Sequence, residues 1–368
     1  MKRPIRLDIH ELAGSMGDFG TLLPLAIGYV ASCGLDPAGF LVMMGVANIA
    51  AGLIYRLPMP VEPMKVLAVV AIAQHWSPSM VYASGFGMGI VWLFLATTGI
   101  IGWIAKVTPA SVVMGIQATL GVLLATEALR LGSTSWPLAV LGVAIVLTLR
   151  RNKYAPAAIV LVVLGLGIML LGGEFERFGS VALRLPTFTT FTAAEVWQTL
   201  LLAGFAQVPL TATNAVISTS SLITSYWPDE HVSARKLSFS HAAMNLVAPL
   251  LGGMPMCHGS GGLVGQYFYG ARTAGANLIE GTLEVLMGLF LAGSIAGIFA
   301  AFPQAIIGAM MFMVGIELIK FARKLRAWRD LTVLAATVAT ALLTNMAFGY
   351  LAGLAVHRLL ALVPHRRG

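Results

Sequence analysis

Two short segments, far apart in the sequence, combine helix-breaking residues with side chains that could bind an anion. They are residues 58–65 (PMPVEPMK) and residues 252–262 (GGMPMCHGSGG). Proline removes a backbone donor and pushes the preceding residue towards extended geometry, so regular helix can begin only near Pro63 and about Ser260. Each segment should therefore run from an extended stretch into a half-helix with free N–H groups and a positive dipole end.

Two such helix ends facing one another would form an anion site. The glycines would let an oxyanion approach the backbone, and Ser260 could donate its hydroxyl. The alternative is a helix crossing that needs small residues. The occurrence of both segments at matching places in the chain favours a site.

Lys65 should lie deep in an apolar region, where a charge costs about 2.5–3.5 kcal/mol. One interpretation pairs it with Glu62 or Asp18 as a structural ion pair, and the other leaves it to attract an anionic substrate. A pair that opens during transport would serve both roles, so the sequence leaves both open.

Three polar residues, Gln207, Thr211 and Asn214, have i, i+4, i+7 spacing around Pro209 and should share one helix face. They could bond neighbouring helices or the substrate, and the paired half-helices favour the substrate. Asp18 could cap a helix interruption or act as a gate, with the structural role favoured. His258 could be a packing residue or a proton relay, and the sequence does not decide.

The predicted site residues fall into two sets. The substrate-binding set is Pro60, Val61, Glu62, Met64, Lys65, Gln207, Thr211, Asn214, Cys257, His258, Gly259, Ser260, Gly261 and Gly262. The candidate gating or proton-linked set is Asp18, Thr21, Glu62 and His258. Cys33 and Cys257 form no disulfide or metal pattern, and we expect no catalytic residue, metal or cofactor.

Composition indicates the elements that must position these residues. The chain has 368 residues, 58% hydrophobic and 10% charged, with 40 Gly and 17 Pro and a mean hydropathy of +0.86. This excludes a water-soluble core and fits a polytopic helical membrane protein. The net charge of +8 does not indicate a nucleic-acid partner, because the basic residues lie between apolar segments.

Fourteen apolar segments can be traced, and each is predicted to span the bilayer. They lie near 14–32, 38–55, 60–74, 79–104, 109–129, 135–149, 155–172, 196–222, 234–252, 255–268, 275–301, 303–319, 330–345 and 347–363. With the N-terminus in the cytoplasm, nineteen basic residues lie inside and three outside. We therefore expect both termini in the cytoplasm, the first span to be retained rather than cleaved, and an inner (plasma) membrane location.

Seven plus seven spans make an inverted repeat, because an odd number separates equivalent elements. The repeats would be 1–172 and 195–368, joined by an extracytoplasmic connector at 173–194. Residues recur at offsets of 194 to 197: Met59-Pro60 with Met254-Pro255, Pro109 and Gly121 with Pro303 and Gly315, and Asn48 with Asn245. The nearly constant offset supports the repeat.

Residues 17–24 (GDFGTLLP), 58–65 and 254–263 closely resemble signatures of the MOT-type molybdate transporters, distant relatives of the SulP sulfate permeases. The resemblance implies a uracil-permease-like, all-α fold with core and gate domains. It also implies proton-driven uptake of molybdate, or in some members sulfate or tungstate, held between the third and tenth segments. We expect no STAS domain after the last span. Glu62 is a departure, because the family usually has Gln there; either it is protonated when substrate binds or Lys65 neutralises it.

We therefore expect a secondary active transporter of a tetrahedral oxyanion. A nucleobase permease on the same fold is the alternative, favoured by Glu62 as an acceptor. A membrane-embedded enzyme using Asp18, Cys257 and His258 lacks any known catalytic spacing, and a passive channel is a further option. The expected partners are the oxyanion, a proton and the lipid bilayer. The sequence does not decide the preference between molybdate and sulfate, nor the coupling ion. It also leaves the oligomeric state open, for which a homodimer is one option.

Overall fold

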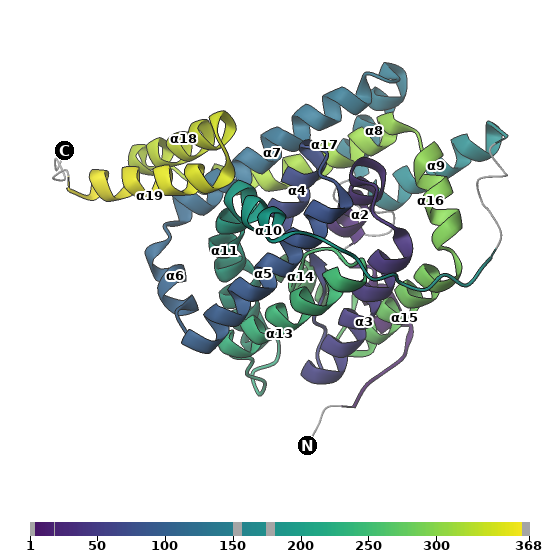
Figure 1. Ribbon diagram of the computed structural model, residues 1–368, viewed down its shortest axis with the longest axis horizontal. Coiled ribbons are helices and arrows are strands. Elements are labelled where there is room, and N and C mark those ends of the chain that lie inside the picture. The colour runs from purple at the N-terminus through teal and green to yellow at the C-terminus, as the bar shows by residue number, and fades with distance from the viewer. Residues whose placement is uncertain (1–3, 18, 150–156, 174–180, 363–368) are drawn as a thin grey trace.

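The protein is described by a computed structural model that covers residues 4–17, 19–149, 157–173 and 181–362. Most of these residues are helical (Figure 1). In the first half the elements are α1 (Ile9–Ser15), α2 (Phe19–Cys33), α3 (Pro37–Tyr55), β1 (Glu62–Pro63), α4 (Lys65–Ala73), α5 (Pro78–Thr98), α6 (Ile101–Val107), α7 (Ala110–Gly132), α8 (Trp136–Leu149) and α9 (Ala157–Leu171).

The second half begins with a long helical run in which α-helical and π-helical turns alternate. This run consists of α10 (Ala193–Thr199), η2 (Leu200–Gly204), α11 (Phe205–Thr211), η3 (Ala212–Ser218) and α12 (Thr219–Tyr226). The remaining elements are α13 (Ala234–Val247), η4 (Ala248–Leu251), β2 (Met256–Cys257), α14 (Ser260–Tyr269), α15 (Gly275–Phe290), α16 (Ala292–Ala301), α17 (Gln304–Lys320), η5 (Phe321–Lys324), α18 (Trp328–Leu343) and α19 (Met346–Leu362).

Local sequence signals explain where several of these helices begin and end. In α3, Asp36 accepts a hydrogen bond from the amide of Ala38, and Pro37 occupies the first helical position. In α5, Ser77 caps the amide of Met80 in the same way. Helix α5 ends at Thr98. The next residue, Gly99, has a left-handed φ of 72°, a conformation that favours glycine because it has no Cβ.

Each predicted apolar segment contains a helix, and two of the segments are each divided into two helices. The segment 275–301 is divided into α15 and α16, which are bent by 84°, and the segment 79–104 is divided at Gly99 into α5 and α6. Among the described residues, four helices are long and apolar enough to cross a membrane, or five if the bent pair counts as one span. The four are α3, α5, α7 and the run from α10 to α12.

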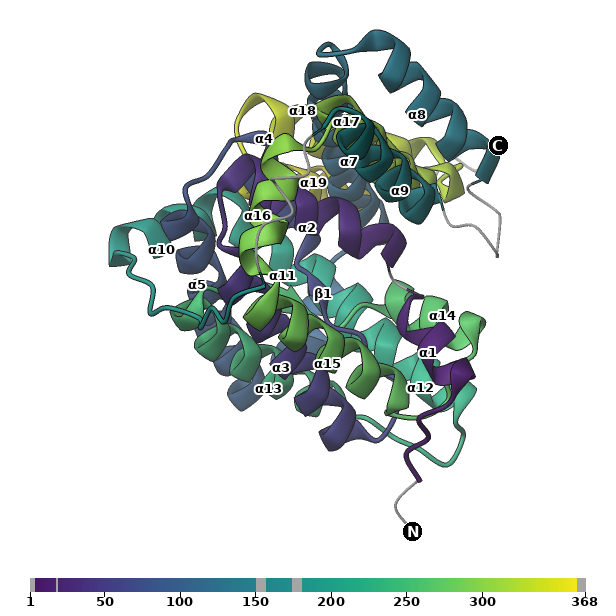
Figure 2. The ribbon, with the colours of Figure 1, turned by 90° about the vertical axis from the view of Figure 1, so that its right-hand side faces the viewer.

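The helices form two groups, which Figure 2 shows one above the other. In the upper group α17 packs along α7, α8 packs on α17, and α18 packs on α19 and α7. In the lower group α3 packs along α15 and α13 along α5. The crossing of α7 and α17 is so close that a Cβ on Gly121 would overlap Ile319 and the carbonyl of Gly315, so Gly is required there.

Helix α4 lies inside the molecule, and its residues 66–72 are buried. This position explains why the segment is apolar on every side. The extended stretches expected before the two half-helices are present in this largely helical fold, and in β1 and β2 they pair as two short antiparallel strands. The polar backbone groups of these extended segments need partners within an apolar region, and strand pairing supplies some of them.

The connector between the halves is described from residue 181. It runs extended along the ends of α15 and η4, where the amide of Arg184 donates to the carbonyl of Leu289 at 2.7 Å and that of Thr189 to Leu250 at 3.1 Å. These contacts fix the connector on the lower helix group.

Candidate functional site

The two proline- and glycine-interrupted segments meet as predicted. Glu62 lies opposite Cys257 and Pro63 opposite Met256 in the antiparallel pair, and the amide of Met64 donates to the carbonyl of Pro255 at 2.9 Å. Helix α4 begins at Lys65 and α14 at Ser260, directly after their strands. The half-helices therefore start from one shared structural unit.

Two asparagines hold the extended segments in place. Asn277 on α15 accepts from the amide of Met59 at 2.7 Å and donates to its carbonyl at 2.6 Å. In the same way, Asn245 on α13 accepts from the amide of Met256 at 2.8 Å and donates to its carbonyl at 2.7 Å. Both side chains are fully buried, so each replaces the hydrogen bonds that a neighbouring strand would supply.

From the sequence, Asn245 was considered only as a residue that recurs between the repeats, and Asn277 was not predicted. The available signal was a carboxamide within a largely apolar helical segment, which usually marks a polar contact between elements. Asn277 also donates to Asn48 at 3.0 Å, and Asn48 donates to Glu284 at 2.9 Å. A buried series of side-chain hydrogen bonds thus links α3 and α15 behind β1.

The expectation that both half-helices present free N–H groups is wrong for α4. The Gln207 side-chain oxygen accepts from the amide of Val66 at 2.7 Å and of Leu67 at 3.4 Å. These are among the orphan donors at the helix start. Gln207 therefore caps α4, whereas the described contacts include no side-chain cap on the first amides of α14.

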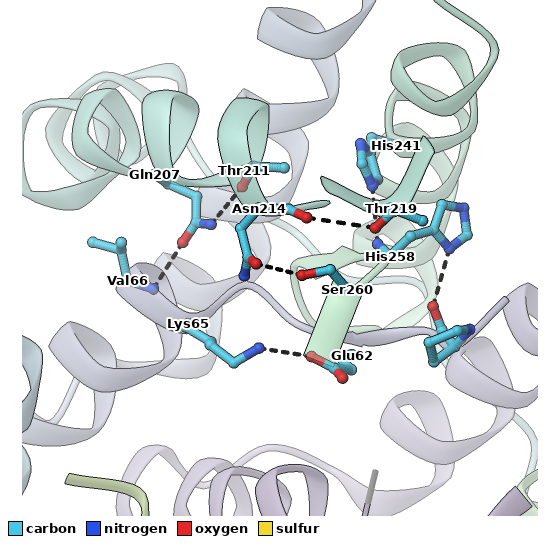
Figure 3. A network of polar contacts seen from close by, with 11 residues as sticks. Glu62, Lys65, Val66, Gln207, Thr211, Asn214, Thr219, His241, His258 and Ser260 are labelled. Carbon is cyan, nitrogen blue, oxygen red and sulfur yellow. Dashed lines mark hydrogen bonds and ion pairs between the residues drawn. The ribbon is translucent and has the colours of Figure 1, made fainter. Parts of the chain in front are cut away.

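The polar face predicted on residues 207–214 is present and contacts both half-helices (Figure 3). Gln207 reaches α4 and donates to Thr211 at 2.6 Å. Asn214 accepts from the Ser260 hydroxyl at 2.5 Å. Asn214 lies in the π-helical turn η3, where the hydroxyl of Thr219 reaches back five residues to its carbonyl. The run from α10 to α12 thereby joins the starts of α4 and α14.

Lys65 forms the ion pair that the sequence left as one alternative. Its amine lies 2.7 Å from a Glu62 carboxylate oxygen, with side chains 17% and 2% exposed. The Glu62 carboxylate also lies against the start of α14, because a Cβ at Gly259 or Gly262 would overlap it. Glu62 therefore occupies the positive end of α14 beside Lys65.

Gly261 differs from its two neighbouring glycines. It is exposed, and apart from its chain neighbours and the backbone of its own helix no described atom lies within 4 Å of the position that its Cβ would take. Open space therefore adjoins the first turn of α14, next to the Ser260 hydroxyl. A small anion could enter here and reach the amides of that turn.

His258 is held on all sides by protein. Its amide donates to Nε2 of His241 at 2.9 Å, its Nδ1 lies 3.1 Å from the carbonyl of Pro60, and its Nε2 lies 2.7 Å from the Ser240 hydroxyl. Because a carbonyl only accepts, Nδ1 carries the hydrogen. These contacts fit the packing alternative: His258 joins the first extended segment to α13.

The other predicted residues form the walls of this unit. Val61, Met64 and Cys257 are buried, at 0%, 0% and 5% exposure, so they shape the strands rather than face open space. Asp18 lies outside the described residues, and Thr21 belongs to α2 with its side chain not described. Within the described ranges, no three His, Cys, Asp or Glu side chains are grouped to hold a metal ion.

Comparisons with known proteins identify relatives along most of the chain. Molybdate transporter 1 of Arabidopsis thaliana is 28% identical over 401 residues, covering 95% of this chain and 87% of that protein. Molybdate transporter 1 of Chlamydomonas reinhardtii is 28% identical over 478 residues, covering 95% and 91%.

Solved structures show the fold. The transmembrane domain of a cyanobacterial bicarbonate transporter, BicA, matches with a TM-score of 0.72 at 20% identity, covering 97% of this chain and 98% of that one. SLC26A9 matches with a TM-score of 0.73 at 12% identity, covering 96% of this chain and 65% of that one. The protein is thus a helical membrane protein with a transporter fold, as expected at this level.

A family model described as "Molybdate transporter of MFS superfamily" matches residues 10–124 and 199–318. The match covers more than half of the chain and includes both extended segments, both half-helices and the polar face on α11 and η3. This chain therefore belongs to that family of molybdate transporters.

Proposed function

We propose that this protein is a secondary active transporter that takes up molybdate, driven by protons. The observation that carries the proposal is the meeting of α4 and α14 on the polar face of α11 and η3, with Lys65 and Ser260 at their first positions. A cation, a hydroxyl and a helix N-terminus together suit a compact oxyanion. Family membership supplies the choice of molybdate.

The ion would be held mainly at α14. As the first residues of a helix, Ser260, Gly261 and Gly262 have no carbonyl one turn earlier within it, so their amides point out of the helix end. The open position at Gly261 admits the ion to these amides. The Lys65 amine would add a hydrogen bond to its oxygens. The Ser260 hydroxyl would add another by turning its single hydrogen from Asn214 to the ion. Gln207 caps α4 and keeps it in place.

Transport would proceed by movement of a core, made of the lower helix group together with α4 and α14, against the other helices of the upper group, a gate. An apolar cleft of about 820 Å³ supports this idea, because it lies between the groups, lined by residues of α5, α11 and α19, such as Phe94, Pro209 and Leu351. Loosely packed apolar surfaces can shift past each other without losing polar contacts.

The proposal includes fourteen spans arranged as two inverted repeats, 1–172 and 195–368, with the connector 173–194 outside. Equal spacing supports this, since Lys65 and Ser260, which begin α4 and α14, are 195 positions apart, as are the paired Glu62 and Cys257. The distribution of basic residues supports an inner (plasma) membrane protein with both termini in the cytoplasm.

The rival functions receive less support. A nucleobase permease would use the Glu62 carboxylate as an acceptor, but the Glu62 side chain is 2% exposed against 17% for Lys65, so the amine is the more accessible partner of the pair. An enzyme is set aside because the named relatives are transporters. A channel differs from a transporter in one measurable respect, since it cannot accumulate its ion against a gradient.

Uptake of radiolabelled molybdate into proteoliposomes tests the proposal. With an acidic exterior, we expect accumulation above the external concentration, abolished by a protonophore and reduced by excess tungstate or sulfate if these share the site. Uptake equal to that of empty vesicles, with or without a pH gradient, would reject the proposal. Equilibration without accumulation would instead identify a channel.

A further inference from the structure

Close to the open position at Gly261, the start of α14 already holds an anion of the protein. Glu62 is 1% exposed, its carboxylate is 2.7 Å from the Lys65 amine, and it fills the space beside Gly259 and Gly262. Both glycines are needed for this arrangement, because a Cβ on either would overlap the carboxylate. Glu62 thus occupies two features that an oxyanion substrate would use, the Lys65 amine and the space beside the start of α14.

The charge of Glu62 decides how strongly this position attracts a dianion. While Glu62 is ionised, its charge cancels that of Lys65, leaving only the partial positive charge of α14, equivalent to about half a unit. An incoming dianion would meet the carboxylate as a like charge in a low-dielectric region. When Glu62 is protonated, Lys65 is released to pair with the dianion.

We propose that Glu62 is an internal competitor of the substrate, so that each oxyanion binds together with one proton that neutralises this carboxylate. The inference rests on the proposed function and deepens it, because it names the group that couples protons to the anion. The proton adds to a carboxylate oxygen, and no covalent bond in the substrate changes.

Other titratable groups surround Glu62 and must be distinguished from it. Lys65 belongs to α4. Cys257 lies in β2 and His258 directly follows it, and these two side chains are close enough to interact electrostatically with Glu62. His241 on α13 lies behind His258 and accepts its amide at Nε2. The α11 and η3 face contributes only neutral groups, Gln207 and Asn214. Asp18 lies outside the described residues.

The test is calorimetric titration of the purified full chain with molybdate, at several pH values above the range in which molybdate itself is protonated. Buffers of different ionisation enthalpy give the number of protons taken up. For the wild type we expect up to one proton per molybdate, with the dissociation constant rising by up to about tenfold per pH unit as Glu62 ionises. Wild-type binding without proton uptake throughout would overturn the inference.

Glu62→Gln keeps the shape of the side chain and removes its charge. We expect this variant to bind without proton uptake, with a dissociation constant independent of pH and at least tenfold lower than that of the wild type at the highest pH. Unchanged proton uptake in the variant would overturn the inference and assign the proton to another group, such as His258.

Glu127→Gln is the matched control. Glu127 is also buried and pairs with a residue three positions later, Arg130, at 2.6 Å, but on α7, away from both strands. We expect its binding and proton uptake to equal those of the wild type. Absence of molybdate binding by the wild type at every pH would refute the proposed function itself, whereas pH-independent wild-type binding refutes only the role of Glu62.

Discussion

Removal of Lys65 should expose how strongly the site depends on its ion pair. Lys65→Met keeps most of the side-chain volume and leaves the Glu62 carboxylate buried without its amine partner. Two unit charges about 4 Å apart interact by about 4 kcal/mol at an effective dielectric constant of about 20. Loss of one partner from a buried pair costs about 3–5 kcal/mol. Because the Lys65 side chain is 17% exposed, we expect the lower end, about 3 kcal/mol.

The assay measures the free energy of unfolding in mixed micelles, with tryptophan fluorescence as the signal. It compares Lys65→Met, Glu62→Gln and the double variant with the wild type. Glu62→Gln combined with Lys65→Met removes both charges, so the double variant should recover to within about 1 kcal/mol of the wild type. Arg130→Met is the control, because its pair with Glu127 has the same spacing but Arg130 is 54% exposed, and we expect about 1 kcal/mol or less. A loss below 1 kcal/mol for Lys65→Met, or additive effects in the double variant, would refute this reasoning.

Three further predictions follow from the same site. Gly262→Ala should destabilise the fold in thermal unfolding, whereas Gly261→Ala should leave stability unchanged and weaken molybdate binding about tenfold or more; equal effects would argue against open space at Gly261. Asn277→Ala and Asn245→Ala should each lower the free energy of unfolding by about 2–4 kcal/mol, since each leaves a buried N–H and C=O unpaired, and a loss under 1 kcal/mol would contradict this. Ser260→Ala should raise the dissociation constant about tenfold with little change in melting temperature, and unchanged affinity would remove Ser260 from the site.

Several features of the site could be predicted from the sequence because they follow from local chemistry. Proline and glycine forbid regular helix before Pro63 and before Ser260, and the helices begin at Lys65 and Ser260. The spacing of Gln207, Thr211 and Asn214 predicted a shared polar face, which contacts both half-helices. Local rules were sufficient in these cases.

Other features depend on contacts between distant segments, which a single sequence does not specify. Gln207 caps α4 across 141 positions, so a helix end that looks free in sequence is occupied in the fold. The clamp of Asn277 on Met59 spans 218 positions, and the contact of Glu62 with Gly259 and Gly262 requires the strand register. No proline lies at the bend between α15 and α16, so the sequence gives no such local signal for it.

The location of bound molybdate tests the central claim most directly. Molybdenum scatters X-rays anomalously, so crystals grown with molybdate would reveal its position without reference to the protein density. We expect one strong peak at the first turn of α14, within hydrogen-bond distance of the Ser260 hydroxyl and the Gly261 amide and close to the Lys65 amine. A peak elsewhere in the protein, with this position empty, would contradict it.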